Sequence, residues 1–239
     1  MKKKINSKNS IAIALVLLAC MTLIVGCADW QHRATVIDWV DFVKTDDGTY
    51  TNVWNGVLRD PDTVMQDVVG KVRKKLDGSV HNPAYRSKPG DAAFLDKGTE
   101  LYRVKGFAPE DLVAVQSDDD IGGYRLYAND EYDGLPKADF KSIVRAKPSS
   151  VSVYAFDEVQ PSRVVSGEQG KLLTEMLRQA VYTPDYLSDT EQEPASYQIV
   201  FDTGEPVLYR FYLTDDGDTV RFRSDYQVKD DIRDFLKLP

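Results

Sequence analysis

Beyond about residue 35 the chain is divided into short runs of β-branched and aromatic residues, separated by clusters of Gly, Asp and Ser. Such runs favour strands, and Gly and Asp favour the turns between them. The run at 36–43 precedes a tight-turn sequence at 45–50, where Gly48 can take a positive φ, and a return strand is expected over 50–57. Further strands are expected over 101–106, 112–115 and 124–127. This spacing predicts a twisted sheet or partly open barrel in the N-terminal half.

The pattern changes at 147–150, where we place a domain junction. Ser166-Gly167-Glu168-Gln169 matches a capping box, in which the Ser and Gln side chains each bond a backbone N–H. The helix that follows carries an apolar stripe of helical period and ends before Pro184. Strands are expected over 151–156, 197–202, 207–213 and 219–223, and a final short helix places Ile232, Phe235 and Leu236 on one side. The C-terminal half is therefore predicted to be an antiparallel sheet covered by one or two helices.

Residues 61–76 are compatible with two structures. Pro61 and Asp62 could open a helix with valines and a leucine on one stripe, but Gly70 weakens it, and 69–76 could be a basic-faced strand. We expect a short helix followed by a strand. The whole chain is thus predicted to be α+β with two small β-rich halves: a signal peptide at 1–26, a tether at 27–35, a β-rich domain at 36–147 and an α+β domain at 148–239.

One short sequence pattern occurs twice. Tyr124-Arg125-Leu126-Tyr127 and Tyr209-Arg210-Phe211-Tyr212 share a strand motif. Four residues are too few to establish a duplicated domain, so we attribute the match to chance.

The N-terminal segment has the composition of an export signal. Four lysines at positions 2, 3, 4 and 8 precede an apolar run of 16 residues, 11–26, that leads into Cys27. A permanent membrane helix needs about 20 apolar residues, whereas a signal peptide needs fewer. The stretch Ile24-Val25-Gly26-Cys27 resembles the lipobox of bacterial prolipoproteins. This resemblance implies that Cys27 receives a diacylglycerol and becomes the mature N-terminus, and two acyl chains are enough for stable anchoring.

Two alternatives to that processing remain open. Leu17-Leu18-Ala19-Cys20 also fits a lipobox, but cleavage there would leave an apolar strip at the start of the mature chain, so Cys27 is preferred over Cys20. An uncleaved signal anchor is the other alternative. Each of them places the body outside the cytoplasm.

Composition excludes several partners. The full chain has 30 basic and 38 acidic residues, and loss of the four signal lysines leaves a net charge of −12. Nucleic-acid binding needs clustered Lys and Arg, and anionic lipid would repel this body. The only cysteines are Cys20 and Cys27, so we expect no disulfide, thiol nucleophile or cysteine metal site in the mature body.

Catalytic and cofactor signatures are weak. His32 lies in the tether and His81 in a loop-like stretch, with no Gly-x-Ser-x-Gly motif to present a serine nucleophile. Asp118-Asp119-Asp120 and Asp215-Asp216-Gly217-Asp218 lack the spacing of a calcium-binding loop, so they are interpreted as solvated turns, the second joining two strands. No phosphate-binding loop occurs, and we expect no cofactor or metal. Trp39 and Trp54 are expected in the core, and Trp30 could rest at the membrane interface.

A further resemblance covers residues 36–130. Gly90-Asp91-Ala92-Ala93-Phe94-Leu95, Lys97-Gly98-Thr99-Glu100-Leu101-Tyr102 and Val104-Lys105-Gly106, after Trp39-Val40-Asp41-Phe42-Val43, resemble uncharacterised lipoproteins of Gram-positive bacilli. The resemblance implies a host with a single membrane, with the body on the outer face of the plasma membrane. It brings no catalytic residues.

Three functional hypotheses follow. The first is a non-enzymatic recognition or accessory module that is tethered through the Cys27 lipid and binds an envelope protein or a wall component. The second is a sensor of a small ligand or cation at the junction between the halves. The third is a cell-wall hydrolase, for which sequence cannot select a carboxylate pair. We favour the first.

Overall fold

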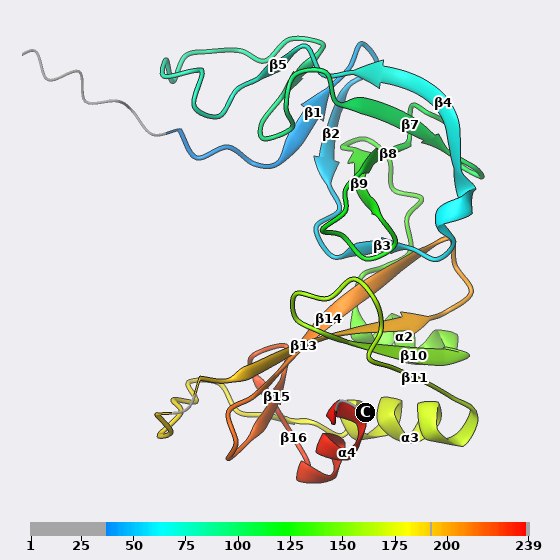
Figure 1. The fold of residues 1–239 in the computed structure, drawn as a ribbon, viewed down its shortest axis with the longest axis vertical. Coiled ribbons are helices and arrows are strands. Elements are labelled where there is room, and N and C mark those ends of the chain that lie inside the picture. Colours follow the sequence, from blue (N-terminus) through cyan, green and yellow to red (C-terminus); the bar gives the residue numbers. More distant parts are fainter. Residues whose placement is uncertain (1–36, 192, 238–239) are drawn as a thin grey trace, which may run out of the picture. The chain divides into compact units, whose positions relative to one another are not determined.

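The computed structural model describes residues 37–191 and 193–237, whose strands form two sheets (Figure 1). The first sheet belongs to the N-terminal half and curls into a half-barrel, while the second is an antiparallel sheet of the C-terminal half. Short helices accompany the second sheet. The predicted α+β class with two β-rich halves is therefore confirmed. The described residues belong to one compact unit that begins at Ile37, and the boundary placed at residue 147 stays a prediction.

The N-terminal sheet has the strand order β4-β7-β8-β9-β2-β1-β6-β5. Its strands are β1 (Phe42–Lys44), β2 (Thr49–Asn52), β4 (Val64–Lys71), β5 (Lys74–Lys75), β6 (Asp91–Ala92), β7 (Glu100–Val104), β8 (Leu112–Gln116) and β9 (Tyr124–Asn129). The predicted hairpin joins β1 and β2, and the Thr45 N–H donates to the Gly48 carbonyl at 2.9 Å. Gly48 has a φ of 149°, a positive value that a residue without a Cβ adopts readily, as expected from the sequence.

Both faces of this sheet are buried at β8. Val113 and Val115 belong to one apolar cluster, and Leu112 and Ala114 point into another. Successive side chains of a strand point to opposite faces, so a strand covered on both sides needs a continuous apolar run. This explains why residues 112–115 carry no polar side chain.

The ambiguous segment 61–76 has the predicted order of a short helix and then a strand. Pro61–Thr63 is a single 3-10 turn (η1), capped by the Asp60 side chain, which accepts from the Asp62 N–H at 3.1 Å. Strand β4 follows and pairs with β7 through two register shifts, the second between Val68 and Gly70. A Cβ on Gly70 would lie 3.0 Å from a Leu101 methyl, so the glycine permits the close approach.

The C-terminal sheet has the order β11-β10-β13-β14-β15-β16-β12. Its strands are β10 (Ser150–Ala155), β11 (Arg163–Ser166), β12 (Val181–Tyr182), β13 (Ala195–Asp202), β14 (Val207–Asp215), β15 (Val220–Phe222) and β16 (Tyr226–Val228). Four of these are the strands expected from the sequence; β11, β12 and β16 were not predicted.

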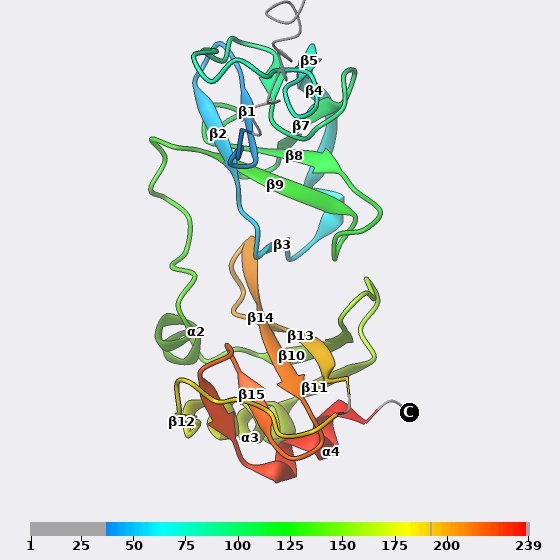
Figure 2. The same cartoon turned by 90° about the vertical axis from the view of Figure 1, so that its left-hand side faces the viewer.

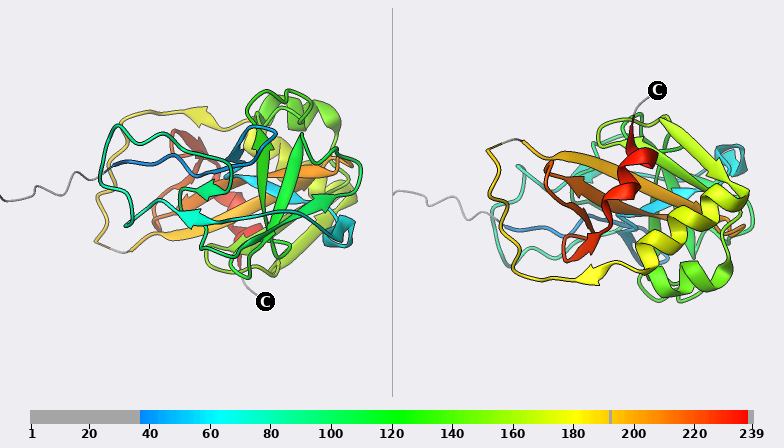
Figure 3. Two further views of the ribbon diagram at one scale, coloured as in Figure 1. Left: turned by 90° about the horizontal axis from the view of Figure 1, so that it is seen from above. Right: turned by 90° about the horizontal axis from the view of Figure 1, so that it is seen from below.

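Helices cover one face of that sheet (Figure 3). They are α2 (Phe140–Ala146), α3 (Gly167–Arg178) and α4 (Arg233–Leu236), with a 3-10 turn η2 (Asp230–Ile232) before α4. The predicted apolar side of the last helix is buried, with Ile232 at 0% and Leu236 at 3% exposure. Helix α2 was not predicted, so the cover is larger than expected.

The two sheets are joined by a strand from the N-terminal half. Strand β3 (Gly56–Leu58) pairs with the start of β14, Leu208 opposite Val57 (Figure 2). One core cluster contains Leu58 and Val104 together with Val207 and Phe201. The halves therefore share apolar packing as well as backbone hydrogen bonds.

Two local predictions were wrong. Ser166 occupies the N-cap of α3 but makes no side-chain cap bond, and Gly167, the first residue of the helix, has a φ of +56°, outside the helical region. Trp54, expected in the core, lies in the turn before β3 and is 61% exposed. Trp39 does pack near the core, its ring 6.3 Å from that of Phe42.

Candidate functional site

The predicted lipidation residue Cys27 lies outside the described residues, together with Cys20, Trp30 and His32. His81 is described; it is exposed in the loop between β5 and β6. Of the described helices, none combines the length and apolar character that crossing a bilayer requires. Within residues 37–191 and 193–237, no group of three or more His, Cys, Asp or Glu side chains is arranged to hold a metal ion.

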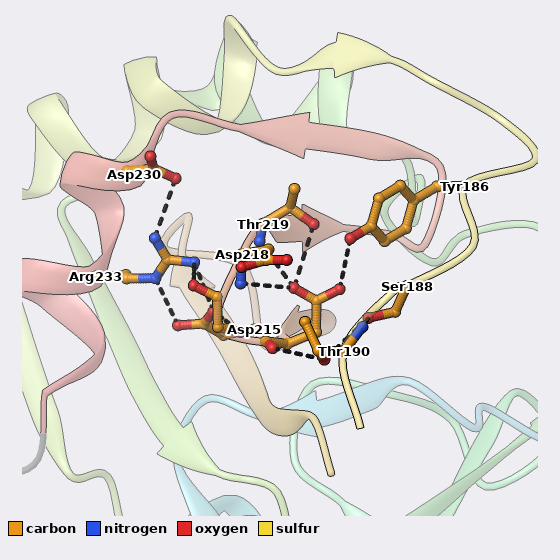
Figure 4. Close-up of polar contacts among 10 residues, drawn as sticks. Tyr186, Ser188, Thr190, Asp215, Asp218, Thr219, Asp230 and Arg233 are labelled. Carbon is orange, nitrogen blue, oxygen red and sulfur yellow. Dashed lines mark hydrogen bonds and ion pairs between the residues drawn. The ribbon is translucent and has the colours of Figure 1, made fainter. Parts of the chain in front are cut away.

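The Asp215–Asp218 stretch is the hairpin turn between β14 and β15, as predicted (Figure 4). Asp216 was expected to be solvated but is only 5% exposed. Its Oδ1 accepts from the Thr219 N–H at 2.8 Å and from the Asp218 N–H at 3.1 Å, and its Oδ2 accepts from the Tyr186 hydroxyl at 2.7 Å. Burial opposes its ionisation, but these donated hydrogen bonds prevail and lower the pKa of Asp216 to about 2.

The neighbouring Asp215 is held by a cation. Arg233 donates from two nitrogens to its two oxygens, at 2.8 and 2.9 Å, a bidentate pair that ties α4 to the hairpin (Figure 4). Hydrogen bonding to this guanidinium lowers the pKa of the Asp215 carboxyl. Asp215 and Asp216 thus organise the turn, and their oxygens are occupied by protein donors.

The other acidic stretch leads to a more open site. Asp120, in the loop between β8 and β9, was expected to be solvated, yet its side chain is only 12% exposed. Its Oδ2 accepts from the Ser117 hydroxyl at 2.6 Å and from the Arg125 Nε at 3.1 Å. A second arginine, Arg210, lies 3.5 Å from the other oxygen. Two cations therefore balance one largely buried carboxylate, as a charge removed from water requires.

Arg210 extends this network into the C-terminal sheet. It lies on β14 and donates to Gln198 Oε1 at 3.3 Å and to the Trp54 carbonyl oxygen. Gln198 in turn donates to the carbonyl of Phe156. Along β13 and β14 the alternate residues Ile199 and Phe211 point into the core, so Gln198 and Arg210 face away from the helices.

A cleft of about 460 Å³ opens beside this network. It is lined by the 118–120 loop, the segment 156–159 after β10, and Gln198, Arg210 and Tyr212 of the sheet. We call it the acidic cleft, because Asp118, Asp119, Asp157 and Glu158 are all exposed on it. None of these four carboxylates forms an ion pair with another residue in the described part of the chain.

Exposed aromatic rings border the acidic cleft. Trp54 stacks on Tyr212 with ring centroids 6.2 Å apart and planes 5° apart. The ring of Phe156 also lies 6.2 Å from that of Tyr212, at an interplanar angle of 51°. Trp54 is 61% and Phe156 50% exposed. We call these three rings the aromatic strip. Contiguous exposed apolar surface next to charged groups is typical of interaction sites.

Comparison of the chain with protein-family models, curated proteins and solved structures finds no match. The site must therefore be interpreted from its own geometry.

The acidic cleft was not predicted from the sequence, although one sequence pattern is related to it. Arg125 and Arg210 occupy the same position in the two Tyr-Arg-x-Tyr motifs, and both reach Asp120. In each motif the residue after the arginine packs in the shared core. This residue is Leu126 in the first motif and Phe211 in the second. The repeated pattern therefore marks two strands that supply cations to one carboxylate.

Proposed function

We propose that this protein is a lipid-anchored extracytoplasmic recognition module whose acidic cleft and aromatic strip bind a basic segment of another envelope protein. The observation that carries the proposal is the position of the exposed Trp54 ring, stacked on Tyr212, beside four carboxylates that have no cation partner among the described residues. The membrane anchor at Cys27 rests on the sequence of residues 1–27, and the position on the outer face of the plasma membrane rests on the resemblance over residues 36–130.

Lysine and arginine side chains fit both parts of this surface. Their charged ends pair with carboxylates, and over an aromatic face a cation gains about 0.5–1 kcal/mol at an exposed site. Their aliphatic stems can cover the rings at the same time. An isolated surface ion pair contributes little, but several carboxylates around one cleft focus the potential and steer a basic partner toward it.

The residues at the base of the acidic cleft are held in place by hydrogen bonds and ion pairs, which favours a role in recognition. Asp120, Arg210 and Gln198 fix the loop, the sheet and the Trp54 backbone to one another through the bonds described above. A surface that is ordered before binding loses less conformational freedom when the partner arrives.

Octalysine is a suitable probe for this proposal. We expect it to bind the full mature chain and to bind at least about tenfold more weakly when four cleft charges are removed. The variant for this is Asp118→Asn, Asp119→Asn, Asp157→Asn and Glu158→Gln. Trp54→Ala should weaken binding by about threefold through loss of the ring face. Isothermal titration at two salt concentrations measures both effects.

A matched control removes four exposed acids elsewhere, with the same change in net charge. These substitutions are Asp46→Asn, Asp47→Asn, Glu131→Gln and Asp133→Asn, all on exposed positions. Equal loss of octalysine binding in both quadruple variants would show general electrostatic attraction and contradict the proposal. If the protein did not bind octalysine, and if both the wild type and the cleft variant bound purified wall, a wall component would instead be favoured as the ligand.

A further inference from the structure

A second concave site lies on the helix-covered side of the C-terminal sheet. It has a volume of about 430 Å³, within the range of roughly 300–1,000 Å³ that small-molecule sites occupy. Its wall is formed by α2, the last turn of α3 and the β15–β16 turn. We call it the basic-rimmed pocket.

The floor of this pocket is apolar and well buried. Phe140, Leu177 and Phe222 line it, and they are 7%, 2% and 2% exposed. Phe140 packs edge-on against Phe222 with ring centroids 4.8 Å apart, so the floor is held by the core behind it. A small apolar group would find a preformed surface here.

The rim carries only positive charge. Lys141, Arg178 and Arg223 line the pocket and no Asp or Glu does, in a chain whose net charge is −8. Arg178 forms an ion pair with Glu175, which lies three residues earlier on α3. Lys141 and Arg223 form no ion pair with another described residue. The local charge is therefore opposite to that of the protein as a whole.

The backbone at Arg223 adds an independent observation. Arg223 and Ser224 both have positive φ, 53° and 64°, in the turn between β15 and β16. Gly or Asn is the usual residue at such positions, because a Cβ there is unfavourable. The arginine is thus held at a strained position, with its guanidinium 5.5 Å from the Tyr226 ring at the edge of the pocket. Strain of this kind is concentrated at functional sites.

We propose that the basic-rimmed pocket binds a small amphiphilic organic anion: an apolar body the size of a phenylalkyl group enters over Phe140 and Phe222, and its carboxylate pairs with Lys141 and Arg223. This site is separate from the acidic cleft, whose lining shares no residue with it. The two proposals can therefore fail independently.

The test uses 4-phenylbutyrate with two analogues that keep the apolar body, the uncharged 4-phenylbutanol and the cationic 4-phenylbutylamine. Titration of the full mature chain should show the carboxylate binding at least about tenfold more tightly than the alcohol, and the amine most weakly. Equal affinity for acid and alcohol would overturn the proposal, because the rim would then contribute nothing.

Variants locate the site. The double variant Lys141→Glu with Arg223→Glu should abolish the preference for the acid. The control Arg86→Glu with Lys105→Glu changes the net charge by the same amount at exposed positions outside the pocket lining, and it should preserve the preference.

The single variant Arg223→Gly removes one cation and relieves the positive-φ strain. It should therefore bind 4-phenylbutyrate more weakly, while its melting temperature does not fall. Unchanged affinity in Arg223→Gly would contradict the assigned role of Arg223, and loss of preference in the Arg86/Lys105 control would contradict the assigned place.

Discussion

Arg210 of β14 and Asp120 of the β8–β9 loop form an ion pair, 3.5 Å apart, that links the two halves of the chain. Both side chains are largely shielded from water, at 16% and 12% exposure. Arg125 also pairs with Asp120, so the carboxylate keeps a partner when Arg210 is changed. Such a network orders the acidic cleft even though a partly buried ion pair adds little to net stability by itself.

Removal of either member of this pair should destabilise the protein by about 2 kcal/mol, because the remaining charge loses a partner in a shielded site. Asp120→Asn, Arg210→Gln and the double variant form a thermodynamic cycle. We expect a coupling of roughly 1 kcal/mol or more, measured by urea unfolding. Additive effects would mean that the two side chains do not interact in solution.

Asp216 should make stability depend on acid pH. Its pKa in the folded protein is about 2, below its ordinary value of 3.8, so the ionised form stabilises the fold above about pH 4. This contribution is lost as the pH falls from about 4 through 2. Asp216→Asn should lower stability at pH 7 by about 1–3 kcal/mol, with a smaller difference from the wild type at pH 2.5.

The exposed neighbour in the same turn is the control for that experiment. Asp218→Asn removes a carboxylate of the same hairpin that is exposed to solvent. Its unfolding free energy should stay within about 0.5 kcal/mol of the wild type at both pH values. If both variants lost the same unfolding free energy, the effect would come from the negative charge of the turn and not from the hydrogen bonds of Asp216.

Phe201 should be among the most sensitive core positions. It is 0% exposed and packs against Phe140 and Phe211, with ring centroids 5.6 and 5.9 Å away. Phe201→Ala should cost about 3–5 kcal/mol through lost burial and the cavity left behind. Phe94→Ala, at a position that is 40% exposed, should cost less than half of that in the same urea series.

The anchor proposed at Cys27 predicts a processing defect. Cys27→Ser should leave the chain at its precursor mass and abolish incorporation of labelled fatty acid, because the residue that carries the acyl chains is lost. Cys20→Ser should change neither. If Cys20→Ser alone blocked processing, the lipidated residue would be Cys20.

The strands were the most predictable part of the fold. Runs such as 112–115 and 197–202 are strongly β-type, and Asp residues lie at their borders, before the first and at the end of the second, so local preference and tertiary structure agree. Helix α2 was missed because its seven residues bury only Phe140 and Ile143, too few to produce a periodic pattern. Its Asp139 cap is a local signal that could have indicated it.

The candidate site was much less predictable. Asp118 and Asp120 stand two residues apart in one acidic run, yet one is exposed and the other is largely buried between two arginines. That difference depends on Arg210, which comes from a strand in the other half of the chain. Trp54 was assigned to the core because its neighbours look strand-like, but it stacks on Tyr212 at the surface. Contacts between distant segments decide both cases, and a local pattern cannot reveal them.

The pairing of β3 with β14 affects when the core of the N-terminal half can be completed during synthesis. Val57 and Leu58 are synthesised long before their partners Leu208 and Val207, which lie far downstream in the sequence. A nascent chain that stops before β14 leaves Leu58 and Val104 without the residues that complete their core. Contacts between segments so far apart in sequence form slowly. A partly synthesised chain would therefore expose these apolar side chains until β14 has been made.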